Sequence, residues 1–188
     1  MTDLQEHLVI SRPSSEDLTD QYVNELLAMY AAVQETVAGT DNDPLWIIGE
    51  HPSAKELCEA AATGSLFVGT VNGELAGALV VDNDQASGYE DVPWQIEAES
   101  NQVAVMHLFA IHPAFRGKGL ARPLIEAAAS AKREDGFTVL RLDTLLKNLR
   151  AQRTYTALGF TNIGNAHLNY GPYTTITGPN FVMFEKAL

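Results

Sequence analysis

The chain has 188 residues, of which 46% are hydrophobic and 19% are charged. This length and composition are typical of a folded domain with its own core, and they exclude an intrinsically disordered chain. The 24 acidic and 12 basic residues give a formal net charge of −12. Such a surface repels nucleic acid and anionic membranes, so we expect neither as a partner, whereas cationic ligands such as amines are favoured.

The sequence also predicts where the protein resides. No apolar run reaches the roughly 18 residues of a membrane-spanning helix. Residues 1–6 lack the basic and apolar segments that open a secretory signal. Cys58 is the only cysteine, so no internal disulfide forms, which is typical of a reducing compartment. We therefore expect a cytoplasmic protein.

Hydrophobic periodicity predicts a mixed α/β domain. The first half is expected to contain a strand, two helices and two further strands, at residues 9–12, 18–37, 52–62, 66–71 and 75–81. Ser14 or Ser15 is placed to cap the first helix. Asn72-Gly73 is a favoured two-residue hairpin turn, which predicts that the two strands around it pair.

The second half begins with a polar loop, 82–101, and a long apolar strand, 103–111. We then expect a helix that ends at about residue 134, followed by a strand at 139–145 and a second helix at 149–158. Two strands, at 160–164 and 181–184, complete the chain. A loop, 169–180, joins the final two strands. No repeat or linker divides the chain, so residues 1–188 are predicted to form a single domain.

A glycine-containing turn between the strand 103–111 and the next helix is the most informative feature. The N-terminus of a helix presents unpaired N–H groups and partial positive charge, and it binds phosphate well. Gly117 and Gly119 allow the backbone to approach an anion closely, while Arg116 and Lys118 add mobile cations. This turn therefore predicts a phosphorylated ligand.

The spacing of this turn is neither Gly-x-Gly-x-x-Gly nor a Walker loop. It reads Arg116-x-x-Gly119-x-Ala121, which resembles the acyl-coenzyme A signature of the GNAT N-acetyltransferase superfamily. A later segment, 148–160, reads Asn-x-x-Ala-x-x-x-Tyr-x-x-x-Gly-Phe and is similar to a conserved helix of that family. The resemblance implies a mixed, mostly antiparallel sheet of about six to seven strands, with helices on both faces and a splayed strand pair that holds CoA.

The resemblance further implies an acyltransferase that moves an acetyl group from acetyl-CoA, its cosubstrate, to the amine of a small molecule or peptide. Asn148 would bind the pantetheine arm, although capping its own helix is an alternative role. The residues expected to bind CoA are Phe109, Ala110, Ile111, Arg116, Gly117, Lys118, Gly119, Leu120, Ala121, Arg122 and Asn148.

Two residues are candidates for proton transfer. Tyr155 stays protonated at neutral pH and could give its proton to the departing thiolate, or it could be a core aromatic. Val105 stands where many family members carry a glutamate base, which leaves His107 as the candidate base. Strand alternation places His107 on the same face as Val105 and Phe109, so a plain hydrogen-bonded histidine is the alternative.

The acceptor pocket is predicted less directly. Trp46 and Trp94 follow carboxylates in the sequence and could form a cage for an ammonium group, or they could be packing anchors. Asp143, on the strand 139–145, is a further acceptor-side candidate and an alternative base. Glu97 and Glu99 could remove a proton through ordered water. The histidines are scattered without metal-ligand spacing, so we expect no metal.

Two other functions remain open at this stage. The chain could be a CoA-binding regulatory or sensor domain without turnover, because the glutamate is missing. It could also use a longer acyl-CoA as donor. The sequence leaves open which amine accepts the group and whether the protein forms a homodimer.

Overall fold

The computed structural model describes residues 7–169, 178 and 180–188. Part of the expected loop 169–180 and the N-terminal residues 1–6 lie outside this range. The described residues form a mixed α/β structure in the order that the sequence predicts. Its strands and helices are β1 (Leu8–Ser11), α1 (Asp20–Val37), α2 (Ala54–Ala62), β2 (Leu66–Val71), β3 (Glu74–Asp82), β4 (Val103–Ile111), α3 (Ala121–Glu134), β5 (Val139–Leu145), α4 (Leu149–Ala157), β6 (Thr161–Ala166) and β7 (Phe181–Ala187).

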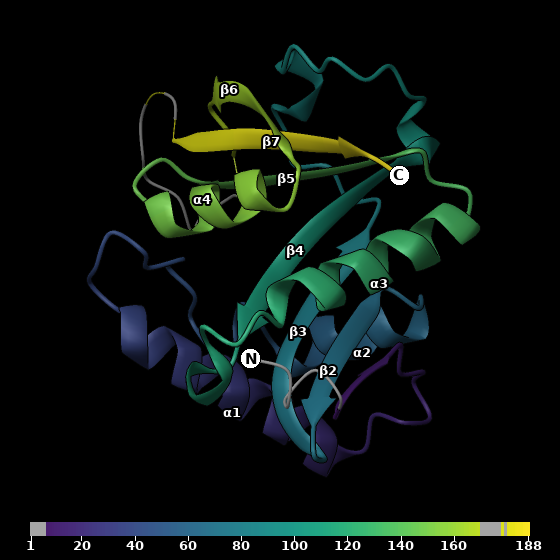
Figure 1. Cartoon of the computed structure of the whole chain (residues 1–188), viewed down its shortest axis with the longest axis vertical. Helices are drawn as coiled ribbons and strands as arrows, with labels where there is room; N and C mark the ends of the chain where they lie inside the picture. The colour runs from purple at the N-terminus through teal and green to yellow at the C-terminus, as the bar shows by residue number, and fades with distance from the viewer. Residues whose placement is uncertain (1–6, 170–177, 179) are drawn as a thin grey trace.

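The strands form one sheet in the order β1-β2-β3-β4-β5-β7-β6. Every pair of neighbours is antiparallel except β4 and β5, which are parallel. That parallel pairing covers only Val103–Val105 against Val139–Arg141. Beyond it the two strands separate, as Figure 1 shows. The mostly antiparallel sheet and its splayed strand pair are therefore confirmed.

Helices cover both faces of the sheet (Figure 1). Apolar side chains of α1 and α2 pack with β2, β3 and β4 in one buried cluster. On the other face, α3 and α4 pack against the middle of the sheet in a second cluster. Burying the apolar stripe of each helix against the sheet supplies most of the stability of such a layered fold. No helix in the described part of the chain is long and apolar enough to cross a membrane.

The start of α1 differs from the prediction. Thr19, not Ser14 or Ser15, is the N-cap, and its side chain accepts a hydrogen bond from the Tyr22 N–H. Ser14 instead pairs with the Asp17 carboxylate through both its N–H and its hydroxyl. The serine cap was wrong because a turn closed by the Asp17 N–H and the Ser14 carbonyl precedes the helix, which begins only at Asp20.

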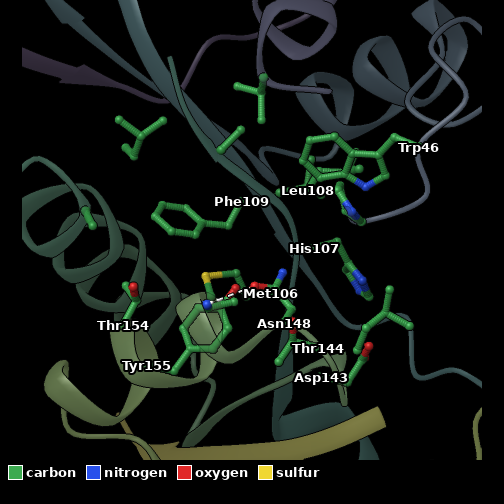
Figure 2. Close-up of a pocket in the computed structure, with 18 of the residues that line it drawn as sticks. Trp46, Met106, His107, Leu108, Phe109, Asp143, Thr144, Asn148, Thr154 and Tyr155 are labelled. Atoms are coloured by element: carbon green, nitrogen blue, oxygen red, sulfur yellow. Dashed lines mark hydrogen bonds between the residues drawn. The ribbon is translucent and has the colours of Figure 1, made fainter. Parts of the chain in front are cut away.

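A bulge interrupts the alternation of β4. The β3–β4 pairing places Ala78 opposite Ala110 but Val80 opposite His107, so two residues of β4 face one of β3. Leu108 has φ = 52°, which lies in the left-handed region. His107 and Leu108 consequently point to one side of the strand and Phe109 to the other (Figure 2). The prediction that His107 and Phe109 lie on the same face of the strand was therefore wrong.

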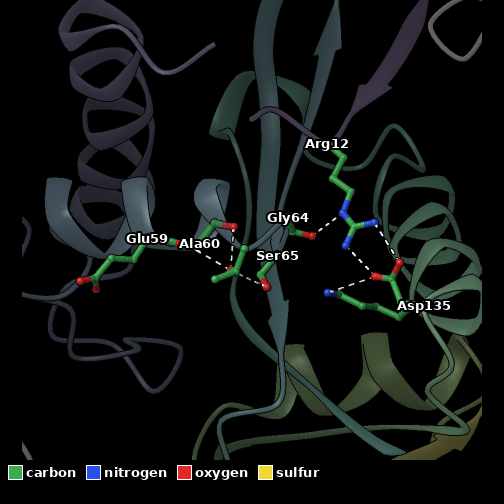
Figure 3. Close-up of polar contacts among 8 residues, drawn as sticks. Arg12, Glu59, Ala60, Gly64, Ser65 and Asp135 are labelled. Atoms are coloured by element: carbon green, nitrogen blue, oxygen red, sulfur yellow. Dashed lines mark hydrogen bonds and ion pairs between the residues drawn. The ribbon is translucent and has the colours of Figure 1, made fainter. Parts of the chain in front are cut away.

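A polar cluster joins the two helical layers at one end of the sheet (Figure 3). The Arg12 guanidinium, just after β1, donates to the carbonyl of Gly64, just after α2. It also forms an ion pair with Asp135 at the C-cap of α3, with 2.6 Å between Nη2 and Oδ2. Lys132 lies 3.6 Å from the same carboxylate. Arg12 thus connects the end of β1 to the ends of α2 and α3, which lie on opposite faces of the sheet.

Candidate active site

A cleft of about 1140 Å³ lies at the splay between β4 and β5. It brings together residues from the loop after α1, from β4 and β5, from the glycine turn before α3, and from α4. Most of the site residues predicted from the sequence line it: Trp46, His107, Phe109, Ala110, Ile111, Arg116, Gly117, Gly119, Leu120, Ala121, Asp143, Asn148 and Tyr155. Lys118, Arg122 and Trp94 do not.

The glycine turn presents its backbone to this cleft. Gly117 and Gly119 have φ values of 75° and 78°, a conformation that glycine adopts without steric cost. A Cβ atom at Gly117 would meet no heavy atom within 4 Å, so the approach to its backbone is open. Leu120, the N-cap of α3, offers no side-chain acceptor to the first N–H groups of that helix. This open, uncapped helix start fits an anionic group such as a phosphate.

Two arginines stand near each other at this end of the cleft. Arg116 donates to Thr36 Oγ1 at 2.7 Å and to the Ile111 carbonyl at 3.3 Å, which holds it between α1 and β4. Burial, and then the nearby charge of Arg150, lowers the pKa of Arg116. Arg150 lines the same cleft from the first turn of α4. Sequence reasoning did not assign Arg150 a role, although it lies inside the motif 148–160.

The other two predicted cations take different positions. The Lys118 ammonium lies 5.0 Å from the ring centroid of Phe115. Arg122 pairs with Glu126 at 3.1 Å, one turn along α3, and donates to the Ala157 carbonyl at 2.9 Å. Arg122 therefore links the start of α3 to the end of α4 and is engaged with protein groups rather than with the cleft.

Tyr155 is both a core residue and a cleft residue. Its ring packs with Phe109, Phe160 and Phe184, at centroid distances of 6.4, 6.0 and 5.7 Å, and only 7% of the residue is exposed. Burial, followed by the negative charge of Asp143, raises the pKa of the phenol. Both effects keep its proton in place at neutral pH, as a general acid requires.

Asn148 caps a helix and lines the cleft. It is the N-cap of α4, and its Oδ1 accepts a hydrogen bond from the Ala151 N–H at 3.0 Å. It lines the cleft at the same time. The cap fixes the direction in which α4 leaves β5, and therefore the position of Tyr155 two turns later.

His107 is held by acceptors on one ring nitrogen. Its Nε2 lies 3.2 Å from Asp82 Oδ1 and 3.2 Å from the Asp84 carbonyl. Both partners accept hydrogen bonds, so Nε2 carries the proton in the neutral ring and the basic lone pair is on Nδ1. Nδ1 has no hydrogen-bond partner among the described residues. Burial lowers the pKa of His107, but the hydrogen bond and charge of Asp82, with Asp143 and Asp84, raise it overall.

Sequence reasoning missed Asp82. It lies at the end of β3, where the antiparallel register sets it opposite Val105. His107 pairs with Val80, two residues before Asp82, so it reaches the carboxylate diagonally across the two strands. Carboxylates from α2 and the loop before it, Glu50, Glu56 and Glu59, also line this side of the cleft. The wall that faces His107 is accordingly acidic.

The two predicted tryptophans are not brought together. Trp46 lines the cleft and packs edge-on against Tyr30, with ring centroids 5.3 Å apart. Trp94 instead lies 4.2 Å from the Arg141 guanidinium, and its Nε1 donates to the Tyr89 carbonyl. It lines a different pocket together with Glu97 and Glu99. These positions match the alternative role of Trp94 as a packing anchor.

Asp143 lies on β5 and lines the cleft together with His107. Its Oδ2 accepts a hydrogen bond from the Tyr89 hydroxyl at 2.8 Å. That bond ties the loop between β3 and β4 to the splay. Within residues 7–169, 178 and 180–188, no group of three or more His, Cys, Asp or Glu side chains is arranged to hold a metal ion.

The fold and the cleft are those of an acetyltransferase domain, and the comparisons agree. The model of the acetyltransferase (GNAT) family matches residues 24–160, so the chain belongs to the GNAT acetyltransferase family. No curated protein matches it in sequence.

Solved structures share the fold at low sequence identity. A GNAT-family acetyltransferase from Streptococcus agalactiae aligns with a TM-score of 0.75 and 18% identity, over 96% of this chain and 95% of that one. The yncA protein of Salmonella typhimurium, solved with its cofactor acetyl-CoA, aligns with a TM-score of 0.63 and 16% identity, over 96% and 94%. A GNAT-family acetyltransferase from Listeria monocytogenes aligns with a TM-score of 0.66 and 18% identity, over 96% of this chain and 95% of that one.

Proposed function

We propose that this protein transfers the acetyl group of acetyl-CoA to the amine of a small molecule or peptide. The observation that carries the proposal is the division of one cleft by β4. Phe109 and Tyr155 lie on one side of this strand, and His107 and Trp46 on the other (Figure 2), while the glycine turn lines the same cleft. A donor and an acceptor can therefore enter from opposite sides and meet at the splay.

The donor side suits coenzyme A. The open backbone at Gly117, with Gly119, Arg116 and Arg150 also lining the cleft, would hold the phosphates. The exposed edge of β4 beyond Val105 lacks its β5 partner and would pair with the pantetheine arm. The yncA structure, which contains acetyl-CoA, shares this fold. CoA would supply the thioester whose C–S bond breaks in the reaction.

The acceptor side suits a cationic amine. Its carboxylates attract an ammonium group, and Trp46 offers an aromatic face to it. The amine must lose a proton before its nitrogen can attack the acetyl carbon. Nδ1 of His107 is the free basic atom on this side, so we assign it as the acceptor of that proton.

Tyr155 completes the proton balance on the donor side. Attack by the amine releases CoA as a thiolate, which needs a proton to leave as the thiol. The phenol of Tyr155 is kept protonated by burial and by the charge of Asp143. It gives its proton to sulfur, and solvent returns one to the phenolate. The amide, the thiol and one released proton are the products.

The test is thiol release from acetyl-CoA in the presence of a panel of amines, with CoA affinity measured in parallel. The proposal expects release that is accelerated by cationic small-molecule or peptide amines, and poorly or not at all by acidic ones. Tight CoA binding with no accelerating amine would contradict it and favour a CoA-binding regulatory domain. Faster release from longer acyl-CoA donors would reassign the transferred group.

A further inference from the structure

Tyr30 of α1 contacts the bulge of β4 through a single hydrogen bond. The residue is fully buried, and its hydroxyl donates to the Leu108 carbonyl at 2.9 Å. Burial raises the pKa of this phenol, so the hydroxyl remains a donor at every working pH. A buried hydroxyl is retained in an apolar cluster only when it has a partner. The partner here is one particular peptide of the strand that divides the cleft.

That peptide is in an unfavourable conformation. Leu108 has φ = 52°, which a branched residue rarely adopts. The pairing of β3 with β4 skips Leu108 and Phe109, so the ladder does not hold them. Such a conformation persists only where the surrounding structure enforces it. The Tyr30 hydroxyl is a direct constraint on this peptide from outside the sheet.

Because the peptide is planar and trans, the hydrogen bond from Tyr30 to the Leu108 carbonyl also fixes the direction of the Phe109 N–H. The carbonyl of Leu108 and the N–H of Phe109 belong to one peptide unit and point in opposite directions. Because the carbonyl points at Tyr30, the N–H points away from α1. The Phe109 side chain and Tyr155 lie on that side of β4 (Figure 2).

We propose that Tyr30 is a positioning residue, which locks the 108–109 peptide so that the Phe109 N–H faces the carbonyl oxygen of the bound thioester. This inference rests on the proposed function, since it assumes an acyl-CoA donor in the cleft. The oxygen gains negative charge as the amine attacks, and an N–H fixed in advance stabilises that charge without reorganisation. Rotation of the same peptide would present a carbonyl there instead and repel the charge.

The principal experiment is Tyr30→Phe, which removes the hydroxyl and keeps the ring. Loss of a preorganised donor costs about 10²-fold in turnover, so kcat should fall by about tenfold or more when the peptide is free to rotate. CoA affinity should stay within about twofold, because the glycine turn is untouched. Wild-type kcat in this variant would overturn the proposal. Absence of amine-dependent release in the wild-type protein would instead refute the proposed function.

Leu26→Ala is the matched control for destabilisation. Leu26 is fully buried one turn earlier on α1, in the same cluster, and does not line the cleft. It should lower the melting temperature at least as much as Tyr30→Phe while kcat stays close to wild type below that temperature. An equal fall of kcat in both variants would reduce Tyr30 to a packing residue and overturn the proposal.

A second measurement needs only the wild-type protein and so does not depend on the folding of a variant. Amide hydrogen exchange at Phe109 is followed with CoA and with acetyl-CoA bound. Acetyl-CoA should slow this exchange several-fold more than CoA, because only the thioester has the carbonyl that accepts the bond. Equal exchange in the two complexes would show that the N–H faces elsewhere and would overturn the proposal.

Discussion

The imidazole of His107 and the carboxylate of Asp82 lie 3.2 Å apart as a diagonal pair on the neighbouring strands β4 and β3. The contact places the proton of the neutral ring on Nε2, which leaves the lone pair on Nδ1, the atom that we propose as the base. It also raises the pKa of His107 against the opposing effect of burial. A base must be deprotonated to act, so in the proposed mechanism the carboxylate would both orient the ring and set the pH at which His107 accepts a proton.

Asp82→Asn should therefore move the acid limb of the pH–rate profile to lower pH. In the wild type the raised pKa of His107 means that activity appears only as pH rises above the ordinary histidine value of about 6.5. Without the Asp82 charge the pKa falls, and the neutral base persists to lower pH. The measurement is kcat/KM from pH 5 to 9. His107→Ala should remove this limb altogether.

Asp135→Asn serves as the control for that profile. It also removes one negative charge, but at the far end of α3 from the splay. Its acid limb should coincide with that of the wild type. If Asp82→Asn leaves the profile unaltered too, His107 is not the base.

Tyr155→Phe should lower kcat by about 10²-fold, the usual contribution of a general acid, with CoA affinity nearly unchanged. The ring contacts with Phe109, Phe160 and Phe184 do not need the hydroxyl, so the variant should fold. Steady-state kinetics and CoA titration separate the two effects. Tyr22→Phe, on the outer part of α1, should behave as wild type. Full activity of Tyr155→Phe would leave Tyr155 as a core aromatic alone.

Gly117→Ala should reduce the affinity for CoA, and the loss of folding stability in the variant should not account for this reduction. Gly117 and Gly136 both have positive φ, and a Cβ at either meets nothing within 4 Å. Either alanine variant should thus lose about 1 kcal/mol of unfolding free energy to backbone strain. Only Gly117 faces the cleft, so only Gly117→Ala should reduce CoA affinity in calorimetric titration. Gly119→Val should abolish binding; equal affinities throughout would refute a phosphate site at this turn.

Asp135→Asn should also destabilise the fold, and only above acidic pH. The Arg12 side chain, followed by Lys132, lowers the pKa of Asp135 in the folded state. The stabilisation is therefore present above the unfolded-state pKa of about 3.9 and is lost as pH falls through the folded value. A half-exposed pair contributes about 1 kcal/mol or less.

Urea denaturation at pH 7 and at pH 2.5 measures this difference. The variant should be less stable at pH 7 and equal to the wild type at pH 2.5. The exposed Asp41→Asn change should match the wild type at both. A pH-independent loss in Asp135→Asn would attribute the effect to packing instead of charge.

Much of the fold was predictable because its signals are local. Apolar periodicity, the Asn72-Gly73 turn and the glycine turn each depend on residues a few positions apart, and their strands and helices were predicted in the right order. The same locality explains the CoA side of the site. Gly117, Gly119 and the start of α3 are neighbours in the chain, so their spacing alone indicated an anion-binding turn.

The sequence could not place the two tryptophans relative to the cleft, because that side of the cleft is built from distant segments. Trp46 and Trp94 carry the same local signal, a tryptophan after carboxylates, yet only Trp46 lines the cleft. Nothing near Trp94 in the sequence indicates that Arg141, a residue of β5, will lie against its ring. Which aromatic side chain faces a pocket is decided by how loops pack on the sheet.

The sequence by itself determined the class of fold, the family and the position of the glycine turn, since those depend on short-range patterns. Only the tertiary structure decided that Asp82 meets His107, that the bulge turns Phe109 to the opposite side, and that Tyr30 holds the bulged peptide. The physical reason is strand register. A shift of one residue reverses the face of every side chain after it, and that shift is set by long-range pairing and packing.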